Sequence, residues 1–351
     1  MDMRLASDLI TIVLLLADLG LAVVALRAWR RNREAAAGLL AVTFALLGVV
    51  VLIGMILPVH SDDAAVLWAR KLVVAGLFVF PYCLYRFMAS FEAPRRRADT
   101  VAALATGAVV LATFVVPHFP ERGEVRPGWW GPFALAVVLQ WSALSVTVVV
   151  RLWQGGRDQG AVARKRMRTM ASGSVLLNVA LVLAAATSQH ANPSLLVAGR
   201  TLSLASVVLF FVGFSPPAFL RLVWRQPELL ALRNAEVALL AANNVGDVAD
   251  ALLPHVTRMM GGRGAAFVDL NGVVVAAHGI SVDEAAALVD GGDRPDVLGA
   301  WLSVGRIVVQ ASPFAPFFGR DEVELLRGLA LFSDLALART ELLAEERRSR
   351  L

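Results

Sequence analysis

The sequence predicts a membrane all-α bundle of seven helices followed by a cytosolic α+β domain. The first reason is composition: 58% of the 351 residues are hydrophobic and 17% are charged, with a mean hydropathy of +0.66. Soluble proteins carry about 45–50% apolar and about 25% charged residues. The second is a set of seven long apolar stretches, and the third is a change of composition after Ser215-Pro216-Pro217. A purely soluble, disordered or fibrous protein is therefore excluded.

Each of the seven stretches is about as long as one crossing of a bilayer requires, which is about 17–25 apolar residues. They cover residues 8–26, 35–57, 69–91, 100–119, 131–151, 169–188 and 195–214. Ser215-Pro216-Pro217 ends the last of them, because proline cannot donate a hydrogen bond within a helix. These boundaries define a membrane domain over residues 1–214.

Positive charges follow the first, third and fifth stretches, whereas the other loops are poor in them. The three clusters are Arg27, Arg30, Arg31 and Arg33; Arg86 and Arg95–Arg97; and Arg151, Arg157, Arg164, Lys165, Arg166 and Arg168. Cytoplasmic loops are enriched in Lys and Arg. We therefore expect a multi-pass protein of the cell (inner) membrane, with its N-terminus outside and its C-terminus in the cytoplasm. The positive charge reflects membrane orientation, so no nucleic-acid partner is expected.

The remaining residues alternate between helix and strand patterns. Helices are predicted over 226–244 and 247–260, strands over 265–270 and 273–278 around Asn271-Gly272, and strands over 300–304 and 306–311. Ser281-Val282-Asp283-Glu284 is a capping box that begins a short helix, and a long helix covers about 321–348. The predicted domains are a juxtamembrane linker helix over 215–234, an α+β domain over 235–345 and a polar tail over 346–351.

The first 214 residues resemble the N-terminal seven-transmembrane sensory region of bacterial sensor histidine kinases. The residues that carry this resemblance are Leu67-Trp68-Ala69-Arg70-Lys71, Phe80-Pro81-Tyr82-Cys83-Leu84-Tyr85-Arg86-Phe87, and Pro216-Pro217 followed by Leu220-Arg221 and Trp224-Arg225. The resemblance implies a bacterial sensor of a two-component system.

Residues 235–345 are similar to a small GAF domain, a fold that binds ligands and relays signals. The supporting stretches are Gly264–Asp269, the Asn-Gly hairpin, and Pro316-Phe317-Phe318 before Asp321-Glu322-Val323-Glu324-Leu325-Leu326. A family kinase would continue past Glu341–Glu346 into a phosphoacceptor helix and an ATP-binding domain, and this sequence has neither. We expect either a stand-alone sensor or the truncated input half of a sensor histidine kinase.

Charged residues inside the apolar stretches are candidates for a polar switch, because charges are costly within a bilayer. Asp18 lies in the middle of the first stretch and Arg200 lies near the start of the seventh, with Arg70 and Lys71 at the start of the third. A salt bridge from Asp18, or from Asp8 near the outer end of the first stretch, to Arg200 or Arg70 could break or form as a signal arrives. The alternative is a static bridge, or snorkelling of the residues at the ends.

A metal or pH-sensing site in the outer loops is a weaker possibility. His60, His118 and His190 lie in these loops with Asp62, Asp63, Glu121 and Glu124 nearby, but without the spacing of metal ligands. No metal, catalytic or cofactor-binding residue is therefore predicted.

In the GAF-like domain we expect a ligand pocket over one face of the sheet, near Phe267, Val275, His278 and Trp301. The same residues could equally be ordinary core. A thioether-linked bilin is excluded because the domain has no cysteine, and retinal is excluded because the seventh stretch has no lysine.

The closing helix carries apolar residues with alternating spacings of four and three. Leu325, Leu329, Phe332, Ala336 and Leu343 form this candidate dimer seam, with Arg339 interrupting it. We therefore expect a homodimer, while packing of the stripe on the domain's own sheet remains the alternative.

Together these features favour a non-catalytic membrane receptor. It would couple a membrane or extracellular cue and a cytosolic input to a kinase or other output protein, with an unidentified small-molecule ligand. The alternative from another class is a small-molecule transporter or channel with a cytosolic regulatory domain; Pro58, Pro81 and Pro117 leave room for broken helices. An enzyme is not expected, because no kinase, cyclase or hydrolase motif is present.

Overall fold

In the computed structural model the chain divides into two units, a bundle unit and a sheet unit. The structure describes residues 3–57, 63–91, 96–116, 119–120, 126–157, 159–187, 193–241, 245–290, 297–318 and 320–349. The bundle unit contains Met1–Gln154 and Arg168–Ser215, and the sheet unit contains Gly155–Met167 and Pro216–Leu351. The main division follows the predicted boundary near residue 214. The segment Gly155–Met167 was predicted within the membrane domain, but it clusters with the sheet unit.

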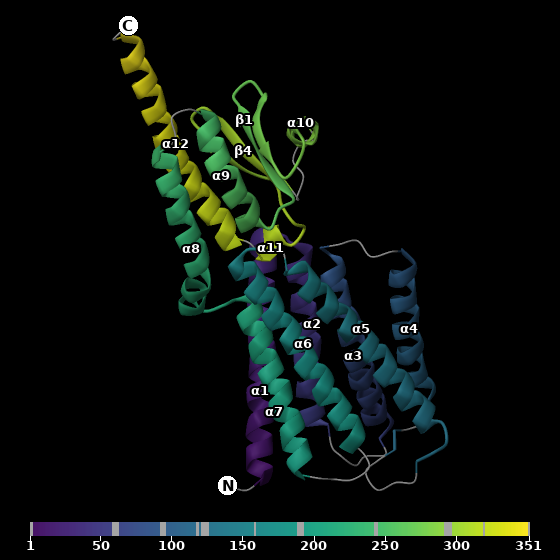
Figure 1. Ribbon diagram of the computed structural model, residues 1–351. Helices are drawn as coiled ribbons and strands as arrows, with labels where there is room; N and C mark the ends of the chain where they lie inside the picture. The colour runs from purple at the N-terminus through teal and green to yellow at the C-terminus, as the bar shows by residue number, and fades with distance from the viewer. Residues whose placement is uncertain are drawn as a thin grey trace. The chain divides into compact units, whose positions relative to one another are not determined.

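Within the described residues, seven helices are long and apolar enough to span a membrane (Figure 1). They are α1 (Met3–Asn32), α2 (Ala35–Ile56), α3 (Ala64–Ala89), α4 (Arg96–Val115), α5 (Trp130–Gly155), α6 (Ala161–Thr187) and α7 (Pro193–Phe214). These helices confirm the seven predicted stretches and are consistent with a multi-pass membrane protein. Helix α6 begins eight residues earlier than predicted, because its first turns are basic and a search for apolar residues overlooks them.

A chain of buried aromatic rings holds four helices of the bundle unit together. The ring of Phe44 on α2 lies 5.1 Å from that of Phe210 on α7 and 6.1 Å from that of Phe80 on α3, and Phe80 stacks on Trp141 of α5 at 5.7 Å. All four side chains are buried. Helices in lipid associate mainly through van der Waals packing, since the bilayer is as apolar as the side chains. The large rings supply that contact area.

The sheet unit contains a four-stranded antiparallel sheet with the order β2-β1-β4-β3. Its strands are β1 (Gly264–Asp269), β2 (Val274–His278), β3 (Val297–Leu302) and β4 (Gly305–Gln310). Along β1 the register pairs Phe267 with Ala276 of β2 and with Ile307 of β4. The predicted Asn271-Gly272 hairpin is confirmed as the β1–β2 turn.

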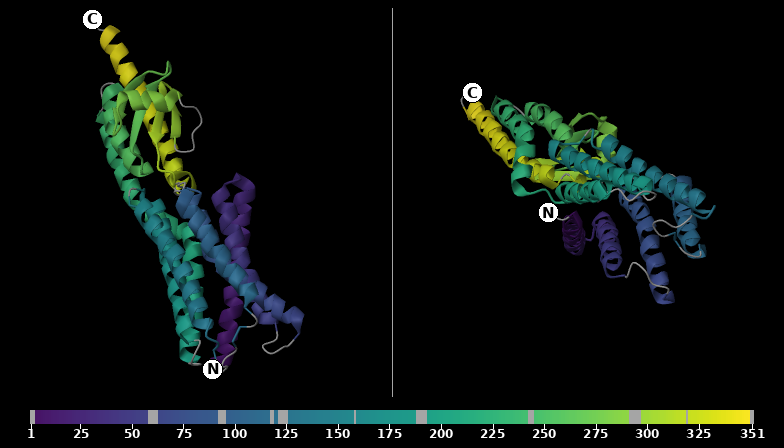
Figure 2. Two further views of the ribbon diagram at one scale, coloured as in Figure 1. Left: turned by 90° about the vertical axis from the view of Figure 1, so that its right-hand side faces the viewer. Right: turned by 90° about the horizontal axis from the view of Figure 1, so that it is seen from below.

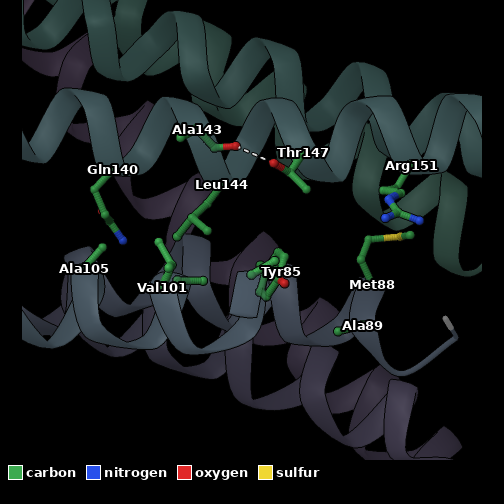
Figure 3. Close-up of a pocket in the computed structure, with 12 residues that line it drawn as sticks. Tyr85, Met88, Ala89, Val101, Ala105, Gln140, Ala143, Leu144, Thr147 and Arg151 are labelled. Atoms are coloured by element: carbon green, nitrogen blue, oxygen red, sulfur yellow. Dashed lines mark hydrogen bonds between the residues drawn. The ribbon is translucent and has the colours of Figure 1, made fainter. Parts of the chain in front are cut away.

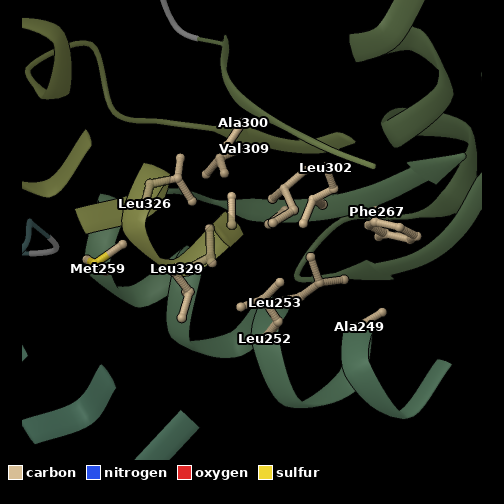
Figure 4. Packing of buried hydrophobic residues seen from close by; sticks show 14 of the residues in the cluster. Ala249, Leu252, Leu253, Met259, Phe267, Ala300, Leu302, Val309, Leu326 and Leu329 are labelled. Carbon is tan, nitrogen blue, oxygen red and sulfur yellow. The ribbon is translucent and has the colours of Figure 1, made fainter. Parts of the chain in front are cut away.

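Helices cover both faces of this sheet. On one face, α9 (Val245–Met260) and α12 (Arg320–Ser349) pack on Phe267, Ile307 and Val309 (Figure 4). On the other face, α10 (Val282–Asp290) packs Ala285 and Leu288 on Ala266, Val268 and Val308. The alternation of side chains along β1 and β4 thus builds two separate cores.

Two local features follow directly from the sequence. At the β1–β2 turn, the carboxylate of Asp269 accepts hydrogen bonds from the backbone N–H groups of Val273 (2.8 Å) and Asn271 (2.9 Å), and Gly272 has a φ of +83°. These hydrogen bonds, chiefly that from Val273, lower the pKa of Asp269. The predicted capping box is also confirmed, since Ser281 N–H donates to Glu284 at 2.9 Å and Glu284 N–H donates to Ser281 Oγ at 3.2 Å.

Helix α8 (Ala218–Ala241) joins the predicted linker helix and the helix predicted after it into one helix. An ion pair of 3.1 Å joins Arg225 of α8 to Glu324 of α12. The last turns of α12 project beyond the sheet (Figure 2). A short helix that the sequence did not predict, α11 (Ala315–Phe318), lies between β4 and α12.

The aromatic chain predicts the effect of two adjacent substitutions on α7. Phe210→Ala should destabilise the bundle unit by roughly 3 kcal/mol, because it leaves a cavity beside Phe44. Phe211→Ala should have little effect, since Phe211 is 38% exposed whereas Phe210 is fully buried. Thermal unfolding of the full chain in detergent measures both. Equal losses for the two variants would contradict this role of the aromatic chain.

A histidine in α9 predicts how the stability of the sheet unit depends on pH. Burial, aided by the positive charge of Arg258, lowers the pKa of His255. Below about pH 6.5 the unfolded chain therefore binds a proton more readily than the folded one, and stability falls as pH falls. Hydrogen exchange of α9 should show this loss of stability in the wild type and a flatter profile in His255→Gln. An identical profile in the two proteins would contradict this assignment.

Candidate functional site

The bundle unit contains a groove of about 470 Å³ between helices α3, α4 and α5. This volume lies in the usual range of small-molecule pockets, about 300–1,000 Å³. Twelve residues line the groove: Tyr85, Met88 and Ala89 of α3; Ala98, Val101, Ala102 and Ala105 of α4; and Gln140, Ala143, Leu144, Thr147 and Arg151 of α5 (Figure 3).

Helix spacing places these residues on facing surfaces. The α5 residues recur at intervals of three and four, so they share one face of that helix. The α4 residues do the same, and three of the four are alanines. Short alanine side chains leave open the space that larger residues would fill, so the groove exists because this face of α4 is small.

The two ends of the groove differ in chemistry. At one end, Gln140 is only 8% exposed; its Nε2 donates to Thr106 Oγ1 at 2.9 Å, while its Oε1 has no hydrogen-bond partner among the described residues. At the other end lies the exposed guanidinium of Arg151. Figure 3 shows these side chains at opposite ends of the row. The hydroxyl of Thr147 donates to Ala143 O of its own helix at 2.7 Å.

The structure does not show the salt bridge predicted for the polar switch. Asp18 is fully buried, but neither of its carboxylate oxygens has a hydrogen-bond partner in the part of the chain that the structure describes. Thus Asp18 does not form the expected bridge to Arg200 or Arg70, both of which are half-buried and have other interactions. An unpaired carboxylate in an apolar interior is unfavourable.

Lys71 and Arg86 join α3 to α4 near their two ends. The ammonium of Lys71 donates to Val116 O at 2.6 Å and to Phe114 O at 3.2 Å, which satisfies carbonyls at the end of α4. At the start of α4, Arg86 forms an ion pair with Asp99 at 2.7 Å. Both contacts hold the α3 and α4 walls of the groove in place. In this structure Lys71, predicted as part of a switch, is bound to the end of α4.

The four residues predicted to line a pocket on the sheet are not brought together. Phe267 is buried in the core under α9 and α12, whereas Val275 and His278 are exposed on the edge strand β2. Trp301, which is exposed, lines a different pocket of about 390 Å³ on the face of the sheet that carries α10, with Arg306 over its ring. Phe267 and Trp301 therefore lie on opposite faces.

The predicted dimer seam is divided between two environments. Leu329 is buried in the domain's own core and Leu325 packs against that core, while Phe332 is half exposed. The side chains of Ala336 and Leu343 lie outside the described residues. A neighbouring stripe of Leu331, Leu335 and Leu342 is about two-thirds exposed.

The metal or pH-sensing site predicted in the outer loops falls largely outside the described residues. His60, His118 and His190 lie outside the described residues, as do Asp62, Glu121 and Glu124. Among the residues that the structure does describe, no group of three or more His, Cys, Asp or Glu side chains could hold a metal ion.

The sequence analysis predicted neither the groove nor the docking of Gly155–Met167 within the sheet unit. Arg166, at the start of α6, is 7% exposed; it donates to Phe318 O at 2.9 Å and to Phe317 O at 3.4 Å, and lies over the ring of Phe318. A Cβ on Gly155 would lie 2.9 Å from Cζ of Phe314 and 3.1 Å from Cε of Met167. Glycine is thus required for this packing.

Comparison with known proteins does not assign this chain to a family. No known protein family matches the chain, and no curated protein or solved structure is significantly similar to it. The function must therefore be argued from the residues themselves.

Asp18 is buried without a partner and Asp99 is paired with Arg86, so replacing each by asparagine should change the stability of the bundle unit in opposite directions. Asp18→Asn should stabilise the bundle unit by about 1 kcal/mol at neutral pH, because burying a carboxyl group without a partner costs free energy whether it stays ionised or takes up a proton, and the neutral amide avoids this cost. Asp99→Asn should destabilise it by up to about 1 kcal/mol, because it weakens a partly exposed ion pair with Arg86. Unfolding of the full chain in detergent measures both. A large loss of stability in Asp18→Asn would instead indicate a partner for Asp18.

Proposed function

We propose that this chain is a non-catalytic receptor module of the cell (inner) membrane. The bundle unit would detect a membrane or extracellular cue, and the sheet unit would act as a GAF-like input domain that passes the signal to a kinase or other output protein. The charge pattern around the seven helices supports an N-terminus outside and a C-terminus in the cytoplasm. The resemblance to sensor histidine kinase input regions supports the same assignment.

The observation that carries this proposal is the Arg166 clamp, by which we mean the hydrogen bonds from Arg166 to Phe317 O and Phe318 O. Helices α5 and α6 belong mainly to the bundle unit, yet the segment that connects them, Gly155–Met167, packs in the sheet unit. The chain thus links the two units at α7–α8 and again at this segment. A displacement of α5 or α6 would alter the hydrogen bonds of Arg166 to α11, which gives the cue a physical route to the sheet unit.

Signal output through α12 is supported by its exposed leucines. Leu331, Leu335 and Leu342 follow the heptad spacing of a coiled coil, with Ala338 between the last two. These residues lie on the part of the helix that is not used by the domain's own core. We propose that a second copy of the chain pairs along this stripe, beside rather than along the seam predicted from Leu325 and Leu329.

Removal of the clamp should loosen α11 selectively. Arg166→Ala removes charge-assisted hydrogen bonds to two buried carbonyls, so the protected amides of Ala315, Phe317 and Phe318 should exchange about a hundredfold faster. Arg157→Ala, which removes an exposed arginine from the same segment, should change little. Hydrogen exchange of the full chain in nanodiscs measures both variants.

The receptor proposal is tested by perturbing only the membrane. Nanodiscs of thin and thick bilayers impose different mismatch on the helices. Exchange of Ser312–Phe318 should differ between the two in the wild type and in Arg157→Ala, and should stop responding in Arg166→Ala. No response in the wild type, or net solute flux through the protein in proteoliposomes, would contradict a receptor and favour the transporter alternative.

A further inference from the structure

We propose that the groove between α3, α4 and α5 binds an elongated amphipathic anion with a hydrogen-bond donor at its apolar end. Its acidic group would lie at Arg151, its apolar body along the alanines of α4, and its donor at Gln140. The inference rests on the proposed function and deepens it, because it names the class of cue that the bundle unit detects.

The distance between the ends sets the length of the ligand. Gln140 and Arg151 are eleven residues apart on α5, which corresponds to about 16 Å along the helix at 1.5 Å per residue. The walls between them are formed mainly by Ala98, Val101, Ala102, Ala105 and Leu144. An apolar groove of this length and volume fits a single alkyl chain rather than a compact polar solute.

Arg151 determines the charge of the ligand. A guanidinium is always protonated, and its planar arrangement of donors matches a carboxylate or phosphate. Arg151 lies near the end of α5, at the same end of the bundle as Arg86 and Asp99. An amphiphile with its acidic group here could keep its alkyl chain within the depth of the bilayer.

Gln140 distinguishes this ligand from an ordinary lipid chain. A purely hydrocarbon chain would leave Gln140 Oε1 without a partner, and a buried unsatisfied acceptor is costly. The side-chain amide is held by its donation to Thr106, so its oxygen is fixed as an acceptor. A hydroxyl or amide N–H at the far end of the ligand would satisfy it.

Two probes that differ only in this donor test the inference. Native mass spectrometry of the full chain in zwitterionic nanodiscs should show that ω-hydroxydodecanoate binds about threefold to tenfold more tightly than dodecanoate, the ratio that one net hydrogen bond gives. Gln140→Leu should abolish this preference. Arg151→Gln should weaken both probes by about tenfold or more, because both carry the carboxylate.

A matched pair of substitutions on α4 tests whether the probes bind in the groove. Ala105→Leu fills the groove and should prevent binding of both probes, whereas Ala103→Leu adds the same side chain at an exposed position that does not line it and should bind as the wild type does. Unchanged binding in Ala105→Leu, or a preference for the hydroxyl that persists in Gln140→Leu, would overturn the inference. Both residues on α4 are exposed, so neither variant should disturb the core.

The source of the anion is distinguished by adding phosphatidylglycerol to the nanodiscs. Unchanged binding of ω-hydroxydodecanoate would indicate a free amphiphile that carries the donor for Gln140. Loss of its binding would indicate that the groove prefers an ordinary anionic lipid, whose acyl chains end without a donor, and would overturn the inference. Failure of the proposed function has a different signature. In that case the probes would bind as described, but the exchange of Ser312–Phe318 would not respond to bilayer thickness.

Discussion

The burial of Arg166 is the constraint that holds the segment Gly155–Met167 in the sheet unit. A guanidinium cannot shed its charge, so it can be buried only where acceptors surround it. The last carbonyls of α11 supply those acceptors, because the end of a helix leaves its carbonyls without intrahelical partners. The ring of Phe318 covers the cation, and Gly155 leaves room for Phe314. The first turns of α6 are thereby fixed within the sheet unit by contacts that neither segment could satisfy alone.

The bundle unit follows the same rule of satisfied polar groups only in part. Lys71 satisfies the end of α4, and Arg86 and Asp99 satisfy each other, so the polar groups that hold α3 and α4 are paired. The exceptions within the described residues include Asp18 and the carbonyl of Gln140. Asp18 lies among packed helices, whereas Gln140 lines a groove with an arginine at its other end. That difference is why the groove, and not the acidic residue first noticed in the sequence, carries the ligand proposal.

Much of the fold could be predicted from the sequence, and the sites mostly could not. Hydropathy located the seven helices, Asn271-Gly272 located the hairpin, and Ser281 with Glu284 located a helix start, because each signal is local. The groove depends on alanines of α4 facing the polar row of α5, a pairing that no local pattern specifies. The periodic placement of Gln140, Thr147 and Arg151 on one face of an apolar helix was a usable signal. The role of Phe314 and α11 could not be predicted, since it depends on Gly155, far away in the chain.

Photo-cross-linking from Met167 tests whether Gly155–Met167 docks onto α11. Photo-methionine incorporated into the full chain, irradiated in native membranes and mapped by mass spectrometry, reports which residues surround the Met167 side chain. We expect a cross-link from Met167 to the peptide that contains Phe314, and a weaker one in Arg166→Ala. Cross-links from Met167 to helices of the bundle unit alone would contradict the docking of Gly155–Met167 within the sheet unit.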